Sequence, residues 1–272
     1  LKVIYFEQDS ANIFPNTDIK GGVVVTYRNA REKLGPIEIF TAFDELNSIL
    51  HKVSVSTKET LDSIISGRGV YRLSEKALNS YPQIEDIQSK GHKYDVGSGA
   101  FKILSNIVFF DGRQSANDVQ ILGLENLNRT YKWIDLDYLN QPKSFYKFKV
   151  FIPQAIGSGA FGEVLSTPLV APPRVGATET FLSIGGFDTR EEAEACLKYI
   201  KTKFARAMLG ILKITQAATR DKWAKVPLQD FTSNSDIDWT QSINDIDQQL
   251  YDKYEFTEEE IDFIESKVKE ME

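Results

Sequence analysis

The sequence predicts a mixed α/β (α+β) fold, because stretches with the period of a strand alternate with stretches with the period of a helix. Phe145–Ile152 alternates apolar residues with tyrosine and lysine, as a strand with one buried face does. From Thr189 onward, apolar residues recur at helical spacing for roughly 25 residues. Between these two stretches the chain is rich in glycine and proline. We expect a sheet with an edge shaped by these residues and a helix packed behind it, which suits binding.

The chain begins with strand patterns. Lys2–Glu7 and Val23–Arg28 are rich in β-branched and aromatic residues, and Phe14-Pro15-Asn16 supplies turn residues between them. A third short strand is expected over Ile37–Thr41. These segments predict a small sheet at the start of the chain.

Helical patterns follow. Phe43, Leu46 and Ile49 have the spacing of one apolar helix face. A second helix is expected over Thr57–Ser66, ended by Gly67-Arg68-Gly69, where a helix stop favours a residue that tolerates positive φ. Residues 80–118 are polar and contain several glycines, and they carry no clear pattern.

Strands return in the middle of the chain, at Val119–Leu124, Thr130–Ile134 and Thr180–Ile184. One uninterrupted helix is expected over Thr189–Leu212, opened by a capping box between Thr189 and Glu192. An extended segment over Trp223–Phe231 follows it.

The C-terminal segment is helical and acidic. Two amphipathic helices are expected, one lined by Ile246 and Leu250, the other by Ile264 and opened by a second capping box, between Thr257 and Glu260. Residues 230–272 contain 14 acidic residues and three lysines and so carry −11, which leaves +4 for residues 1–229 within the net charge of −7. The acid is concentrated in the tail and the body is mildly basic.

Composition excludes several classes of protein. No apolar run approaches the ~20 residues of a membrane span, so no membrane partner is expected. The single cysteine, Cys196, excludes an internal disulfide and fits a reducing compartment, which predicts a cytoplasmic protein. With only His51 and His92 beside it, a structural zinc site is not expected.

Gly157–Val164 (GSGAFGEV) matches the glycine-rich loop of protein kinases, but its context does not. A kinase needs a following strand that carries a lysine, then His-Arg-Asp and Asp-Phe-Gly. Here no lysine occurs between Val164 and Lys198, and neither tripeptide is present. A dinucleotide site is also excluded, because that loop must open a helix and this one leads into Pro168. A turn shaped by glycine is the favoured interpretation.

Several ordered features resemble adenine-specific DNA methyltransferases of the TaqI-like family. The first segments resemble the last two strands of the catalytic domain in that family, and the later ones resemble its target-recognition domain and the ends of related restriction–modification methylases. The residues that carry the resemblance are Val3–Tyr5, Ile13–Pro15, Ile19–Tyr27, Thr189–Leu212, Trp223–Phe231 and Asp236–Glu272. The catalytic Asn-Pro-Pro-Tyr and the glycine-bearing cofactor loop of the family are absent.

The resemblance implies a DNA-recognition region whose catalytic half is missing from this chain. It places the end of a catalytic domain, with a small remnant of its sheet, at residues 1–55, a target-recognition domain at 56–232 and an acidic helical tail at 233–272. No catalytic or cofactor-binding residue is expected here, whereas the parent enzyme would use S-adenosylmethionine. The implied partners are double-stranded DNA, the N-terminal methyltransferase domain and a restriction subunit.

DNA contacts are expected from lysines and arginines for phosphates and from loop side chains for bases, with arginine to guanine the commonest base contact. Arg174 is the leading candidate, because it lies in a stiff proline–glycine turn. The residues expected to contact DNA are Arg174, Thr178, Lys147, Lys149, Arg68, Arg72 and Lys132. The alternative is a protein-interaction module that binds another subunit of a restriction–modification complex through the glycine-rich edge and the acidic helices.

Overall fold

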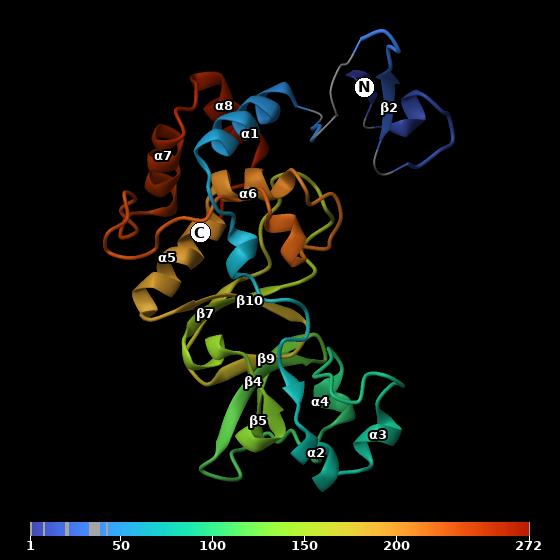
Figure 1. The fold of residues 1–272 in the computed structure, drawn as a ribbon, viewed down its shortest axis with the longest axis vertical. Coiled ribbons are helices and arrows are strands. Elements are labelled where there is room, and N and C mark those ends of the chain that lie inside the picture. The colour runs from blue at the N-terminus through green and yellow to red at the C-terminus, as the bar shows by residue number, and fades with distance from the viewer. Residues whose placement is uncertain (1, 8, 20–21, 33–38, 42, 272) are drawn as a thin grey trace.

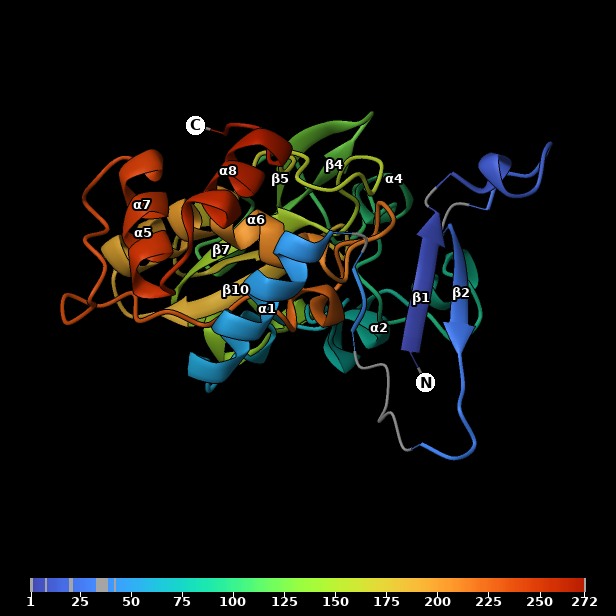
Figure 2. The same cartoon turned by 90° about the horizontal axis from the view of Figure 1, so that it is seen from above.

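The computed structural model describes residues 2–7, 9–19, 22–32, 39–41 and 43–271. Helices α1 and α5–α8 gather at one end of the body, and the sheet of β4, β5 and β9 lies at the other, with α2–α4 beside it (Figure 1). Strands β7 and β10 lie between the two ends. The β1–β2 hairpin stands beside the body in both views (Figures 1 and 2). The mixed α+β class predicted from the sequence is confirmed, with small sheets in place of one large one.

The strands are β1 (Lys2–Glu7), β2 (Val23–Tyr27), β3 (Arg72–Leu73), β4 (Asp118–Glu125), β5 (Asn128–Asp135), β6 (Leu139–Asn140), β7 (Phe148–Pro153), β8 (Leu169–Ala171), β9 (Val175–Ala177) and β10 (Phe181–Phe187). The α-helices are α1 (Asp44–Ser56), α2 (Glu75–Ser80), α3 (Ile84–Ile87), α4 (Ala100–Ile103), α5 (Arg190–Lys201), α6 (Lys203–Gly210), α7 (Ile243–Lys253) and α8 (Glu258–Lys267). Short 3₁₀ turns include η2 (Leu61–Ile64), η4 (Lys143–Tyr146) and η5 (Arg220–Trp223).

Two three-stranded sheets build the body, one between its two ends and one at the end opposite the large helices (Figure 1). In one, β7 lies between β10 and β8 and is antiparallel to both, with Ile152 opposite Leu182. In the other, β4 lies between β5, its antiparallel hairpin partner, and β9, which runs parallel to it. The predicted strands in these regions are confirmed, although Phe145 and Tyr146 belong to η4 and β7 begins at Phe148. The predicted strand over Ile37–Thr41 begins outside the described residues, and its residues 39–41 are not in a strand.

The predicted helix over Thr57–Ser66 is wrong, because most of this segment pairs with a distant part of the chain. The backbone N–H of Leu61 donates to Val226, and that of Leu228 donates to Glu59, at 2.8 and 2.9 Å. These bonds leave only the short η2 turn in the middle. Apolar spacing alone did not distinguish a helix from a segment pinned by long-range backbone bonds.

The predicted single helix over Thr189–Leu212 is also interrupted. Thr202 is extended (φ −56°, ψ 150°) and separates α5 from α6. Its hydroxyl accepts from the N–H of Ala205, while Asp247 of α7 accepts from the N–H groups of Lys203 and Phe204 at 2.9 and 2.8 Å. A buried carboxylate at a helix N-terminus satisfies free donors and complements the helix dipole. The break is therefore stabilised from α7, which the local spacing did not reveal.

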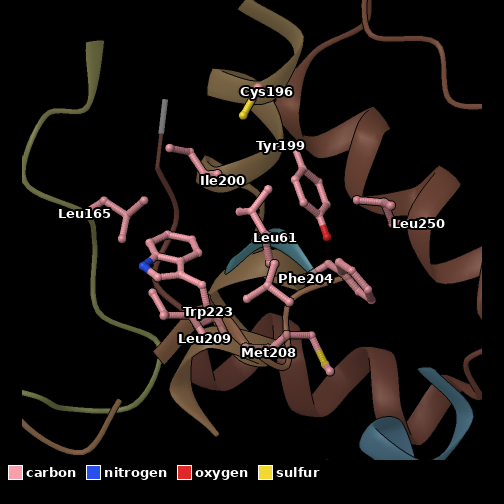
Figure 3. Close-up of a cluster of buried hydrophobic side chains, with 14 of the residues drawn as sticks. Leu61, Leu165, Cys196, Tyr199, Ile200, Phe204, Met208, Leu209, Trp223 and Leu250 are labelled. Atoms are coloured by element: carbon pink, nitrogen blue, oxygen red, sulfur yellow. The ribbon is translucent and has the colours of Figure 1, made fainter. Parts of the chain in front are cut away.

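A single hydrophobic cluster includes side chains from all three sequence segments assigned above to separate domains. Leu46 of α1, Tyr199 of α5 and Leu250 of α7 belong to it. Figure 3 shows Trp223 packed beside Leu209, and Tyr199 and Phe204 facing Leu250. A second cluster, beneath β4, β5 and β9, holds Phe101, Phe109 and Ile121. The tail helices α7 and α8 are thus part of the main core.

The C-terminal helices follow the predicted pattern. Ile246, Leu250 and Ile264 are fully buried. The capping box of Thr257 and Glu260 is present in both directions. At Thr189 only half of the predicted box forms, since the carboxylate of Glu192 accepts from the N–H of Asp188 instead.

The pKa of Asp247 gives the fold a testable pH dependence. Burial raises this pKa to about 6, against the two backbone donors, which favour the carboxylate. Because the folded pKa lies above the unfolded one, the contribution of this group to stability is complete at low pH. It is lost as the pH rises through 6, by about 2 kcal/mol between pH 4 and pH 6.

We therefore expect Asp247→Asn to flatten this part of the stability profile, measured as the difference in urea-unfolding free energy between variant and parent at pH 4, 5, 6 and 7. Asp252→Asn, on the exposed face of the same helix, is the control. Parallel profiles for the parent and Asp247→Asn would contradict the assignment.

Candidate nucleic-acid interface

Two segments that are distant in sequence form one surface. Strand β8 pairs antiparallel with β7, so the residues that precede β7 lie beside those that follow β8. The backbone N–H of Arg174 accordingly donates to the carbonyl of Phe145 at 2.8 Å. We call the exposed side chains of these segments, Lys143, Tyr146, Lys147 and Arg174, the basic ridge.

Lys149 lies beneath the basic ridge and holds its two segments together. Although charged, it is fully buried, and its Nζ donates to the carbonyls of Phe145, Lys147 and Pro172 at 3.1, 2.9 and 3.0 Å. Burial lowers its pKa to about 8, so that the ammonium still predominates at neutral pH. Its three N–H donors then match three carbonyl acceptors.

The outer side chains of the basic ridge combine cations with an aromatic ring. Arg174 has a positive φ of 63°, and within the described residues its guanidinium makes no hydrogen bond or ion pair. Lys147 pairs with Asp188 at 2.7 Å, but both groups are exposed, and such pairs are weak. The ring of Tyr146 is half exposed, and its hydroxyl accepts from Gln141. Cations can bind phosphate, and the arginine fork and the ring can also stack on or bond to a base.

The other expected contact residues lie elsewhere and already have partners. Arg68 binds Glu179 through Nε and one terminal nitrogen at 3.0 and 2.8 Å, and Arg72 pairs with Asp95 at 3.0 Å. Lys132 is buried between Asp111 and Glu125. Thr178 is also buried, and its hydroxyl bonds to Thr180. Of the seven expected residues, the fold brings only Arg174 and Lys147 together on the basic ridge, with Lys149 beneath it.

Strand β5 separates the basic and aromatic residues that follow one another in its sequence. Its alternation places Arg129, Tyr131 and Trp133 on one side, and Lys132 on the other, where its Nζ lies 5.9 Å from the ring centroid of Phe101. Arg129 donates to the carbonyls of Ser166 and Thr167 and so fixes the neighbouring loop to the strand. These four residues therefore do not form one continuous face.

The glycine-rich stretch binds a carboxylate of the chain itself. The N–H groups of Ser158 and Gly159 donate to Glu163 at 2.8 and 3.0 Å, and Glu163 also pairs with the buried Lys213. A Cβ at Gly159 would lie 2.5 Å from the backbone of Thr215, so the turn requires glycine there. The amide groups that would bind a phosphate in a kinase loop are occupied, which agrees with a structural turn.

Other parts of the described chain give weaker support for a ligand site. A cavity of about 890 Å³ beside α5 is lined by acidic side chains, among them Glu191, Glu194 and Asp238, which disfavour an anionic ligand. Within the described residues no three His, Cys, Asp or Glu side chains lie close enough together to hold a metal ion. In the same residues no helix is long and apolar enough to cross a membrane.

Sequence reasoning missed Lys143 as a member of the basic ridge, and it considered Tyr146 only as part of a mixed basic and aromatic face with Lys147 and Lys149. Lys143 and Tyr146 both lie in η4, where no periodic pattern marks a face, and the pairing of β7 with β8 brings this segment to Arg174. Comparison of the chain with models of protein families and with curated proteins gave no match.

Proposed function

We propose that this chain is the sequence-specific DNA-recognition region of an adenine-specific DNA methyltransferase of a restriction–modification system. The observation that carries the proposal is the basic ridge, where exposed cations and a tyrosine ring stand on segments fixed by a buried lysine. Phosphate contacts position a protein on DNA, and an arginine fork matches the major-groove edge of guanine. The rigid base under Arg174 suits such a contact, because it lowers the ordering cost of binding.

The β1–β2 hairpin supports a second part of the proposal, a partner that completes its sheet. Exposed apolar side chains cover this hairpin, among them Ile4, Tyr5, Val24, Val25 and Tyr27. A two-stranded hairpin is marginally stable alone and needs further strands or a packed face. We propose that the methyltransferase domain, which would bind S-adenosylmethionine and act on adenine, supplies this cover, with a restriction subunit as a further partner.

A protein-interaction module is the second candidate. The same exposed hairpin and the acidic cavity beside α5 favour it, since both are surfaces that another subunit can cover. The two candidates differ in one measurement. DNA binding through phosphates weakens steeply as salt increases, whereas the interaction module should show no salt-dependent affinity for duplex DNA.

Arg174→Ala tests the basic ridge directly. We expect weaker binding of the chain to duplexes selected from a randomised pool, measured by fluorescence anisotropy at two salt concentrations. If Arg174 contacts a base, the substitution should cost about 1–3 kcal/mol of binding free energy and relax the specificity at one base pair of the site. If it contacts a phosphate, all duplexes weaken and the salt slope falls by about one.

Arg220→Ala is the matched control for this experiment, because Arg220 is an exposed arginine of η5, outside the basic ridge. We expect it to bind as the parent does. Equal affinity, selectivity and salt slope for parent and Arg174→Ala would remove Arg174 from the interface.

A further inference from the structure

The tip of the β4–β5 hairpin presents an apolar side chain without a role in the fold. Glu125 pairs with Asn128, so the hairpin turns through two residues, Asn126 and Leu127. The side chain of Leu127 is 93% exposed, the highest value among the exposed large hydrophobic residues of the described chain. Leu127 therefore contributes little to packing within the chain.

The backbone at this tip favours glycine. Asn126 and Leu127 both have positive φ, 48° and 65°. A two-residue turn with positive φ at both positions is of type I′, which favours asparagine followed by glycine. Leucine in the left-handed region is disfavoured by its Cβ. The leucine side chain thus strains the turn, and no burial offsets this strain within the chain. The side chain therefore points to a partner outside the chain.

The hairpin is held firmly behind this tip. Arg129 bonds to the carbonyls of Ser166 and Thr167, and Lys132 pairs with Glu125 at 2.8 Å. Gly123 lies against Phe101, where a Cβ would come within 2.5 Å of the ring. Glu125 and the exposed Asp111, two acids behind the tip, both pair with Lys132, and the exposed tip itself consists of Asn126, Leu127 and Asn128. A rigid, uncharged tip that ends in an apolar side chain has the form of a wedge.

We propose that Leu127 inserts between neighbouring base pairs and unstacks them in a duplex that the basic ridge also contacts. This inference rests on the proposed DNA-recognition function. A two-stranded ribbon can lie in a groove of the duplex, and leucine is one of the apolar side chains that minor-groove proteins insert between base steps. The flanking asparagines can bond to base edges on either side.

The spacing between wedge and ridge fits one duplex. Strand β9 begins directly after Arg174 and runs parallel to β4, with Val175 beside Gln120. Five residue steps of β4 separate Gln120 from Glu125, or about 17 Å at 3.3 Å per residue, and the two-residue turn extends this distance only slightly to Leu127. That separation is less than one helical turn of DNA, about 34–36 Å.

The test compares Leu127→Gly and Leu127→Met with the parent chain. Leu127→Gly creates the favoured Asn-Gly turn, so we expect its melting temperature to stay equal or to rise by about 2–4 °C. We expect the same variant to bind a duplex selected by the parent about ten-fold more weakly. With 2-aminopurine at successive positions of that duplex, the parent and Leu127→Met should raise its fluorescence at one step, and Leu127→Gly should not.

A control and the remaining outcomes separate this inference from the proposed function. Ile214→Gly removes another exposed apolar side chain and should leave the 2-aminopurine signal unchanged. If the parent binds duplexes with a steep salt dependence but Leu127→Gly matches it in affinity and fluorescence, the wedge is refuted and DNA recognition stands. If the parent shows no salt-dependent binding, both fail. Loss of binding to phosphatidylcholine vesicles by Leu127→Gly, with DNA binding unchanged, would refute the wedge in favour of a lipid contact.

Discussion

Replacing Ile264 with aspartate is expected to lower the free energy of unfolding by about 3–5 kcal/mol. Ile264 of α8 is fully buried in the main core, and α8 packs against α1 and α6. The substitution removes apolar contacts and places an unpaired carboxylate in the same space. The measurement is urea unfolding followed by circular dichroism, with limited proteolysis to detect release of the tail.

Ser266→Asp adds the same charge to an exposed position of α8 and should change stability by less than about 1 kcal/mol. An Ile264→Asp protein as stable and protease-resistant as the parent would show that α8 is not docked in solution. Partial loss, with the tail cleaved and the remaining core still folded, would instead assign the helices to a separate unit.

Replacing Lys149 with methionine is expected to lower the free energy of unfolding by about 3–4 kcal/mol. Methionine keeps most of the stem, but the carbonyls of Lys147 and Pro172 lose the ammonium donor, while that of Phe145 keeps only the N–H of Arg174. Buried acceptors without a partner are costly, and water can reach them only if the two segments separate. The same change should therefore loosen the basic ridge and weaken any DNA binding that depends on it.

Two measurements check this second expectation. Urea unfolding gives the stability, and hydrogen exchange at the amide of Arg174, which donates to Phe145, reports the order of the ridge. Lys147→Met is the matched control, because it removes an exposed lysine two residues away and should stay within about 0.5 kcal/mol of the parent. Equal exchange at Arg174 in Lys149→Met and parent would show that the ridge is held by other contacts.

Much of the secondary structure followed from local patterns. The strands at Lys2–Glu7 and Val119–Leu124, and the helices of the acidic tail, appear where period and capping residues predict them. The tail helices have one apolar face and one polar face, so burial and local geometry favour the same structure. The capping box of Thr257 and Glu260 is local in the same sense, because both partners lie within one helical turn.

Predictions failed where distant partners outweighed local preference. The segment over Thr57–Ser66 has helical spacing, yet its backbone groups pair with Val226 and Leu228. The long helix has continuous spacing through Thr202, yet Asp247 stabilises a new N-terminus there. In both cases the hydrogen-bond partner is more than forty residues away in the sequence. A local sequence pattern therefore cannot reveal the bond that prevents a continuous helix.

The candidate site, too, could be predicted only in part from the sequence. The sequence alone identified a glycine- and proline-shaped region with Arg174 in a stiff turn, and it excluded a kinase loop by the lysine that is missing after Val164. The tertiary structure alone decided which cations are exposed. Lys149 and Lys147 lie two residues apart in one predicted strand. Lys149 is buried and donates to three backbone carbonyls, whereas Lys147 is exposed to solvent. A lysine side chain is long enough for either position, so its place depends on the carbonyls that the folded chain brings within its reach.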